Sequence, residues 1–229
     1  MEVYVKIIDE ALKEGRTTLT EFESKQVLAS YTLPVTREEL VSRPEDLLKA
    51  ADLIGYPLVI KGCAAEIAHK TELGLVRVDV RNDQEATTAF REISAAMQDA
   101  SDGTILVQQL VKGKRELVVG LTRDQQFGPC VMFGLGGIFT EVLKDTVFRV
   151  APLEKQDALD MMQEIKACKI LEETRGMAAA DKDMLADMLM TVGRIGIEND
   201  AIKEIDINPV IISGGRPVAA DALVVLQKP

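Results

Sequence analysis

The spacing of apolar residues predicts a chain of alternating helices and strands. Apolar side chains recur at intervals of three and four over residues 3–14, which predicts a helix there. A second helix begins near Thr20 and ends before Pro34. A third runs from Pro44 to Gly55, because proline fits the first helical turn and glycine commonly follows the last. Further amphipathic stretches predict helices over residues 83–99, 154–169 and 181–196.

Short apolar or alternating runs predict the strands. Residues 57–62 form an apolar run that ends with Lys61 and a glycine, and residues 75–80 alternate with period two. The runs 104–111 and 116–122 flank a short polar turn and could form a hairpin. The other expected strands are residues 129–133, 147–150, 202–208, 210–213 and 218–226. This mixture predicts an α+β or α/β chain of two lobes, without a linker that marks their boundary.

Charge and cysteine content argue against several kinds of binding partner and of structural site. The chain has 229 residues, with 27 Lys and Arg against 37 Asp and Glu, a formal net charge of −10. Such a surface repels nucleic-acid phosphates and anionic lipids. Cys63, Cys130 and Cys168 form no C-x-x-C pair, which argues against a zinc site or a disulfide framework. No apolar run approaches the ~20 residues of a membrane span, and the first residues are too charged for a secretory signal, so a cytoplasmic protein is expected.

Polar oxygens alternate with apolar residues near the C-terminus, where residues 204–209 read Glu-Ile-Asp-Ile-Asn-Pro. In a strand, Glu204, Asp206 and Asn208 would share one face. Such oxygens suit Mg²⁺, which nucleotide phosphates and water usually complete. Asp221 follows a Gly-Gly turn and could return a further carboxylate to the same place. The final proline is expected to end the strand. A solvated strand face with ordinary alternation is the alternative interpretation.

A glycine cluster, Gly134, Gly136 and Gly137, follows the apolar run 129–133. Glycines let backbone N–H groups approach phosphate oxygens closely. The cluster does not match G-x-G-x-x-G, since Phe139 occupies the place of the last glycine, and no P-loop pattern occurs in the chain. A plain tight turn explains these glycines equally well.

Two further side chains suit phosphate chemistry. Lys61 can place a point charge on phosphates, although lysines at strand ends more often extend into solvent. His69 is the only histidine and lies in a polar stretch that ends at Gly74. Imidazole can be phosphorylated and dephosphorylated near neutral pH. Because a lone histidine is more often incidental than catalytic, both interpretations stay open.

Taken in order, these motifs resemble the beta subunit of ADP-forming acetyl-CoA synthetase, of the NDP-forming acyl-CoA synthetase family, whose fold is the ATP-grasp. Five collinear segments carry the resemblance: residues 19–25, 57–62, 67–74, 131–137 and 204–209. The first and last are also similar to the beta subunit of succinyl-CoA synthetase, which lacks the His-Lys-Thr-Glu-Leu-Gly stretch. The resemblance implies an α+β fold of two lobes that clasp a nucleotide. Its implied parts are a helical extension of residues 1–16 and an ATP-grasp domain of residues 17–229, with lobes of about 17–107 and 108–229.

The resemblance also implies a site for ATP or ADP with Mg²⁺. The implied nucleotide contacts are a lysine on the phosphates, a hinge against adenine, a glutamate of the cleft and glycines over the phosphates: Lys61; Gln108, Gln109, Leu110 and Val111; Glu116; and Gly134, Gly136 and Gly137. The implied metal ligands are Asn208 and Asp221, with Asp206 as a third. His69 matches the family's second phosphohistidine, which receives a phosphoryl group from a histidine of the alpha subunit and passes it to ADP.

The resemblance further implies a partner. The chain has one histidine and no dinucleotide-type fingerprint for coenzyme A. An alpha subunit would supply the CoA-binding and first phosphohistidine sites, in an expected α2β2 assembly. Many relatives have a second glycine where this chain has Leu75, a departure expected to stiffen the histidine segment. Two alternatives stay open: a stand-alone ATP-grasp carboxylate ligase that acts through an acyl phosphate, and a non-catalytic, nucleotide-binding regulatory subunit.

Overall fold

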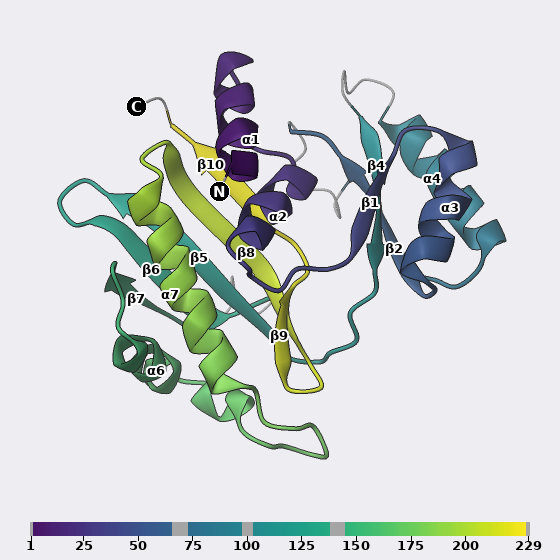
Figure 1. Ribbon diagram of the computed structural model, residues 1–229. Helices are drawn as coiled ribbons and strands as arrows, with labels where there is room; N and C mark the ends of the chain where they lie inside the picture. The colour runs from purple at the N-terminus through teal and green to yellow at the C-terminus, as the bar shows by residue number, and fades with distance from the viewer. Residues whose placement is uncertain (1, 66–72, 98–102, 138–144, 228–229) are drawn as a thin grey trace. The chain divides into compact units, whose positions relative to one another are not determined.

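The computed structural model (Figure 1) describes most of the chain: residues 2–65, 73–97, 103–137 and 145–227. These residues form two compact units, each with an antiparallel sheet and a hydrophobic core. Unit 1 comprises Met1–Leu19, Glu23–Val35 and Val111–Pro229, and unit 2 comprises Thr20–Phe22 and Thr36–Leu110. The α+β mixture is confirmed, whereas the lobe limits given above stay a prediction.

Unit 2 is a four-stranded sheet in the order β1-β4-β2-β3, with helices α3 and α4 on one face (Figure 1). The strands are β1 (Glu38–Val41), β2 (Leu58–Cys63), β3 (Val76–Val80) and β4 (Thr104–Gln109), and the helices are α3 (Pro44–Ile54) and α4 (Asp83–Ala96). Leu58 and Ile60 of β2 pack in the core with both helices. Because strand side chains alternate, Lys61 points to the opposite face. Strand β1 was not expected from the sequence.

Local chemistry sets the limits of both helices of unit 2. Pro44 occupies the first turn of α3, and Gly55 follows its last turn with φ +88°, as predicted. The side chain of Asn82 accepts a hydrogen bond from the Glu85 N–H at 3.0 Å and so caps the start of α4.

Unit 1 is built on a six-stranded sheet in the order β10-β8-β5-β6-β7, with β9 paired to β8. Its strands are β5 (Glu116–Asp124), β6 (Gly128–Leu135), β7 (Thr146–Val150), β8 (Ile202–Ser213), β9 (Arg216–Ala219) and β10 (Leu223–Leu226). Its helices are α1 (Glu2–Lys13), α2 (Glu21–Ser30), α6 (Lys155–Glu164) and α7 (Lys182–Glu198), with a 3-10 helix, η1 (Cys168–Leu171). The first two residues of α2 belong by their contacts to unit 2. The core of unit 1 contains side chains from one face of β5 and β8, including Val119, Ile205 and Ile207. Residues of α7 pack in the same core.

The expected hairpin of residues 104–122 is wrong. Strand β4 lies between β1 and β2, whereas β5 lies between β6 and β8 in the other sheet. Both strands are largely buried and each is hydrogen-bonded on both edges. A short polar turn favours a hairpin locally, but each strand gains more by pairing on both sides within its own sheet.

Pro209 does not end its strand, contrary to expectation. Strand β8 continues to Ser213, although its register against β5 shifts at the proline: Ile207 pairs with Val119, and Val210 pairs with Leu117. Two residues of β8 therefore lie opposite one residue of β5, which is a bulge. The missing N–H of proline falls at this irregularity, where the ladder is already interrupted.

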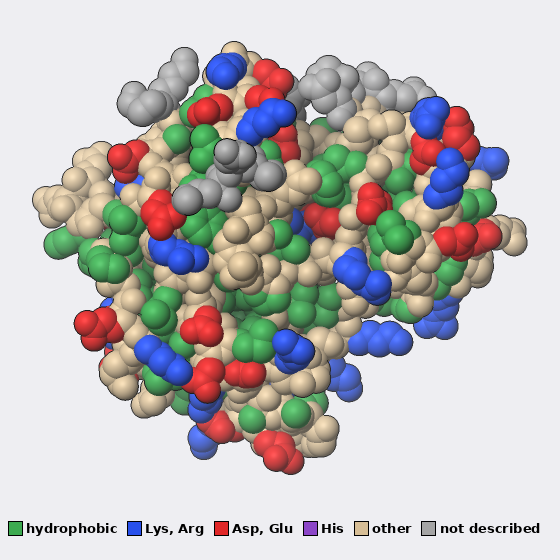
Figure 2. Space-filling view, viewed as in Figure 1, with side chains coloured by type: hydrophobic (Ala, Val, Ile, Leu, Met, Phe, Trp, Pro, Cys, Tyr) green, Lys and Arg blue, Asp and Glu red, His purple; other side chains and the backbone are tan. Residues whose placement is uncertain are grey.

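Two smaller differences concern element limits. The expected helix over residues 154–169 is divided into α6 and η1, and the expected strand over residues 218–226 is divided into β9 and β10. In the part of the chain that the structure describes, no helix has the length and apolar character needed to cross a membrane. Figure 2 shows acidic and basic side chains interspersed over the drawn face.

Candidate functional site

The polar face of β8 lies on the side of the large sheet away from the core. Ile205 and Ile207 are buried, so Glu204, Asp206 and Asn208 project from the opposite face, as predicted. Glu204 is exposed, whereas Asp206 and Asn208 are half-buried. The sheet therefore presents two carboxylates and an amide oxygen side by side.

Asp221 returns to the same place because β9 pairs back along β8. The Ala220 N–H donates to the Pro209 carbonyl at 3.0 Å, which holds the chain beside the strand. Burial first, and then the negative charges of Glu204 and Asp221, raise the pKa of Asp206 to about 6. A carboxylate that is partly buried next to like charges is stabilised by a cation.

The donor set of this face fits a hard cation. Asp206, Asn208 and Asp221 offer carboxylate and amide oxygens, the ligands that Mg²⁺ and Ca²⁺ prefer. Among the described residues, no group of three or more acidic, histidine or cysteine side chains is arranged to hold a metal. Within the described part of the chain, a cation here would therefore rely on the amide oxygen of Asn208 in addition to the carboxylates.

The glycine cluster makes direct contacts with this face. The Gly137 N–H donates to Oδ1 of Asn208 at 3.0 Å, and the Gly136 N–H donates to the Glu116 carbonyl at 2.9 Å. A Cβ at Gly136 would collide with the Leu117 carbonyl. Gly137 has φ +60°, and a Cβ there would collide with the Glu116 carboxylate. These glycines are therefore required for close approach between β6, β5 and β8, which a plain tight turn would not need.

In unit 2, the structure places Lys61 and Gln108 on the sheet face opposite α3 and α4. Lys61 is directly opposite Leu106, and Gln108 is directly opposite Val59, so their side chains lie on the same face. Both polar side chains are buried. The common behaviour of a strand-end lysine, extension into solvent, does not apply to Lys61, because Oε1 of Glu21 lies 2.6 Å from its Nζ.

The expected hinge residues lie where the chain leaves unit 2. Gln109 ends β4, and its N–H donates to the Arg37 carbonyl at 2.9 Å. The Leu110 N–H donates to the Pro57 carbonyl at 3.3 Å, and the contacts of the chain change from unit 2 to unit 1 between Leu110 and Val111. His69 and residues 138–144 lie outside the described residues.

Two acidic residues were not among the predicted site residues. Glu21 lies in a segment that carries the family resemblance, but the resemblance assigns it no role. Asp145 is buried and accepts hydrogen bonds from the N–H groups of Lys166 and Ala167 at 2.7 and 2.8 Å. It thereby holds the chain just after residues 138–144. The contact of Glu21 with Lys61 and the contacts of Asp145 with residues 166 and 167 each join distant segments, so residue spacing could not indicate them.

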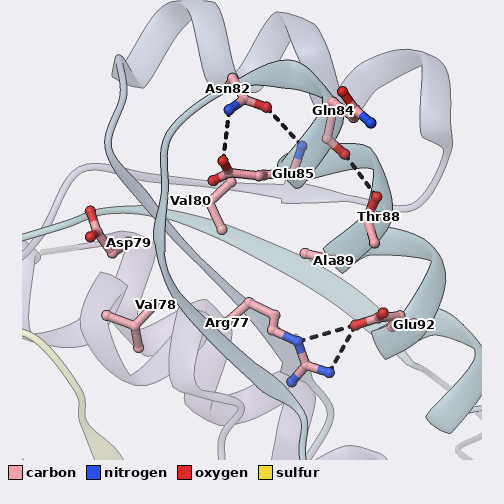
Figure 3. Close-up of a pocket in the computed structure, with 10 residues that line it drawn as sticks. All are labelled: Arg77, Val78, Asp79, Val80, Asn82, Gln84, Glu85, Thr88, Ala89 and Glu92. Carbon is pink, nitrogen blue, oxygen red and sulfur yellow. Dashed lines mark hydrogen bonds and ion pairs between the residues drawn. The ribbon is translucent and has the colours of Figure 1, made fainter.

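The pocket in Figure 3 contains none of the predicted site residues. It has a volume of about 510 Å³ and lies between β3 and the start of α4. Four of its polar side chains are paired: Arg77 with Glu92 at 2.9 Å, and Asn82 with Glu85 at 2.7 Å. Arg77 also donates to the Gly74 carbonyl at 2.9 Å. The polar surface of this pocket therefore consists largely of side chains that already bind their neighbours.

Comparisons with known proteins identify the family. A model of the ATP-grasp domain matches residues 10–226. The chain is 44% identical to the acetate–CoA ligase [ADP-forming] I subunit beta of Pyrococcus furiosus, with 96% of this chain and 97% of that one covered. It is 37% identical to acetate–CoA ligase [ADP-forming] I of Archaeoglobus fulgidus, with 96% of this chain but 33% of that protein covered.

A solved structure agrees with the sequence relatives. It is dinucleotide-forming acetyl-coenzyme A synthetase 1 of Ca. Korarchaeum cryptofilum, in complex with coenzyme A and Mg-AMPPCP, with its phosphohistidine segment pointing towards the nucleotide-binding site. The TM-score is 0.87 at 40% identity, with 98% of this chain and 100% of that chain covered. The chain therefore belongs to the family of ADP-forming acetate–CoA ligase beta subunits, whose fold is the ATP-grasp domain.

Proposed function

We propose that this chain is the nucleotide-binding beta subunit of an ADP-forming acyl-CoA synthetase. It transfers a phosphoryl group between a phosphohistidine of a partner subunit and ADP, through His69. The observation that carries the proposal is the hydrogen bond between the Gly137 N–H and Oδ1 of Asn208. This bond joins a glycine cluster suited to phosphates to an oxygen face suited to a cation.

The residues of unit 1 suit the phosphate end of a nucleotide. Asn208 and Asp221 would hold Mg²⁺, with Asp206 as a third ligand, and the ion would neutralise charge on the phosphoryl oxygens. Gly134, Gly136 and Gly137 would cover the phosphates, because a backbone without side chains allows a close approach. The raised pKa of Asp206 supports this assignment, because a cation would offset the repulsion from the neighbouring carboxylates.

The remaining contacts of the nucleotide are assigned by the family resemblance. Lys61 would donate to the phosphates as a point charge. Residues 108–111 would meet adenine, mainly through backbone groups, and Glu116 would lie in or near the nucleotide cleft. The burial of Lys61 and Gln108 on one sheet face supports their assignment, since the two polar side chains lie on the same face there.

His69 is the proposed nucleophile. A ring nitrogen of His69 attacks the terminal phosphorus of ATP, so that a P–N bond forms while the bond to the ADP oxygen breaks. The same phosphoryl group then passes to a histidine of the partner subunit, and the reverse sequence makes ATP. Transfer of this kind depends mainly on positioning and charge neutralisation. The phosphohistidine segment of the Korarchaeum relative supports a carrier of this type.

The relatives also support a partner subunit. This chain spans about a third of the Archaeoglobus protein, whereas it matches nearly all of the Pyrococcus beta subunit. We infer that an alpha subunit supplies the CoA-binding site and the first phosphohistidine, in an α2β2 assembly. The cytoplasm is the proposed setting, and its reducing conditions suit three cysteines that are all free thiols in the structure.

Phosphoenzyme formation tests the proposal. The purified chain and its His69→Ala variant are incubated with γ-labelled ATP and Mg²⁺, with and without a candidate alpha subunit. The expected product is a label that is lost in acid, stable in base and absent from the variant. Binding of nucleotide with no label in either protein, even with the partner present, would refute the relay.

A further inference from the structure

Glu21 and Lys61 form an ion pair that is almost completely shielded from solvent. The distance between Oε1 of Glu21 and Nζ of Lys61 is 2.6 Å, and their side chains are 1% and 8% exposed. The two residues are 40 positions apart, at the start of α2 and in β2. The pair therefore exists only because the tertiary structure brings a helix end to this strand.

Stability alone does not explain such a pair. Removing two charges from water is costly, and a buried ion pair is often no more stabilising than two apolar side chains of similar size. Breaking the pair by neutralising one partner is worse, since the other charge stays buried. The cross-strand neighbours of Lys61 are apolar, Val76 on β3 and Leu106 on β4, so they add no compensating charge. A charged lysine at this position depends in part on the Glu21 carboxylate, which lies 2.6 Å from its Nζ.

The geometry assigns a role to this dependence. We infer that Glu21 is a positioning residue, which holds the Lys61 ammonium in place to donate to the phosphates of a nucleoside di- or triphosphate. A lysine ammonium has three N–H donors, so the bond to Glu21 does not by itself use up its capacity to donate to an anion. A side chain already held in place loses less conformational freedom when the ligand binds. This inference rests on the proposed nucleotide role of Lys61.

Helix α2 offers a matched control. Glu23 lies two residues after Glu21 and pairs with Arg16 through both carboxylate oxygens, at 2.8 and 3.0 Å. Glu23→Gln therefore makes the same chemical change in the same helix turn and also breaks an ion pair. The ion pair of Glu23 is made with Arg16, which is not assigned to the nucleotide.

The test measures the affinity for ADP in the presence of Mg²⁺ by calorimetric titration of the full chain, and thermal unfolding without nucleotide. The variants are Glu21→Gln, Glu21→Asp, Lys61→Met, the double variant Glu21→Gln/Lys61→Met, and the control Glu23→Gln. Glu21→Gln is expected to weaken ADP binding about tenfold, a change of about 1.4 kcal/mol. Glu21→Asp, which keeps the carboxylate, is expected to retain part of the affinity. Glu23→Gln is expected to bind ADP like the wild type even where its melting temperature falls.

The double variant separates the possible causes. If Glu21 acts through Lys61, the double variant binds ADP no more weakly than Lys61→Met alone. A further loss in the double variant, or normal affinity in folded Glu21→Gln, would overturn the role of Glu21 while leaving that of Lys61 intact. Normal affinity in Lys61→Met would instead overturn the proposed contact between Lys61 and the phosphates.

Discussion

Replacing Asp206 with asparagine is expected to stabilise the metal-free protein at pH 8 and to abolish its stabilisation by Mg²⁺ with ADP. Burial and the charges of Glu204 and Asp221 raise the pKa of Asp206 from 3.8 to about 6. The folded state therefore binds this proton more tightly than the unfolded state. The resulting penalty on the free energy of unfolding is fully present above pH 6 and is lost as the pH falls from 6 towards 4.

The magnitude follows from the two pKa values. A rise from 3.8 to about 6 corresponds to about 3 kcal/mol at pH 8. Since Asp206 is only half-buried, solvent screening reduces the expected gain in the asparagine variant to roughly 1.5 kcal/mol. For a chain of this size each kcal/mol shifts the melting temperature by about 2–4 °C, so a rise of about 5 °C is expected.

The assay is thermal unfolding of wild type and Asp206→Asn in EDTA at pH 8 and pH 4, repeated at pH 8 with Mg²⁺ and ADP. Asp187→Asn is the matched control, because Asp187 is exposed on α7 and its loss changes the net charge equally. Metal and nucleotide are expected to raise the melting temperature of the wild type and the control, but not of Asp206→Asn. Equal stability of Asp206→Asn and wild type at pH 8 without metal would refute the electrostatic argument. An undiminished response to Mg²⁺ and ADP would refute the metal assignment.

Three further substitutions test the surroundings of the site and the fold. Gly136→Ala brings a Cβ against the Leu117 carbonyl, so we expect a loss of about 1–3 kcal/mol in urea unfolding and weaker binding of ADP; wild-type values would show that β6 can move aside. Arg115→Met leaves three carbonyls of the segment 170–178 without their buried donor. A loss of about 2–3 kcal/mol and faster proteolysis in that segment are expected, and unchanged proteolysis would contradict this role. Asn82→Ala removes the cap of α4 and is expected to cost about 1 kcal/mol in urea unfolding, whereas an unchanged midpoint would show that the cap is dispensable.

Local sequence determined most of the secondary structure. Helix α3 begins at Pro44 and is followed by Gly55 because backbone restrictions act within single residues and turns. The alternation of Ile205 and Ile207 with polar residues placed one face of β8 in the core without reference to the rest of the chain. The collinear order of short motifs likewise identified the family before any contact was known.

Pairing between distant strands could not be determined in this way. The sequence around residues 104–122 favours a hairpin, yet β4 and β5 belong to different sheets, because each strand is buried with partners on both edges. The continuation of β8 beyond Pro209 depends on a bulge against β5, which only the pairing partner reveals.

For the charged residues of the candidate site, too, the sequence determined their position in an element and the tertiary structure determined their environment. Sequence spacing placed Asp206 and Asn208 on one strand face, but the raised pKa of Asp206 depends on burial and on the approach of Asp221. The sequence determined that Lys61 ends an apolar strand, whereas only the tertiary structure buried it against Glu21. Backbone preferences act between neighbours in the chain, while burial and charge act through space. The sequence therefore indicated the candidate residues of the site, and the tertiary structure decided their surroundings.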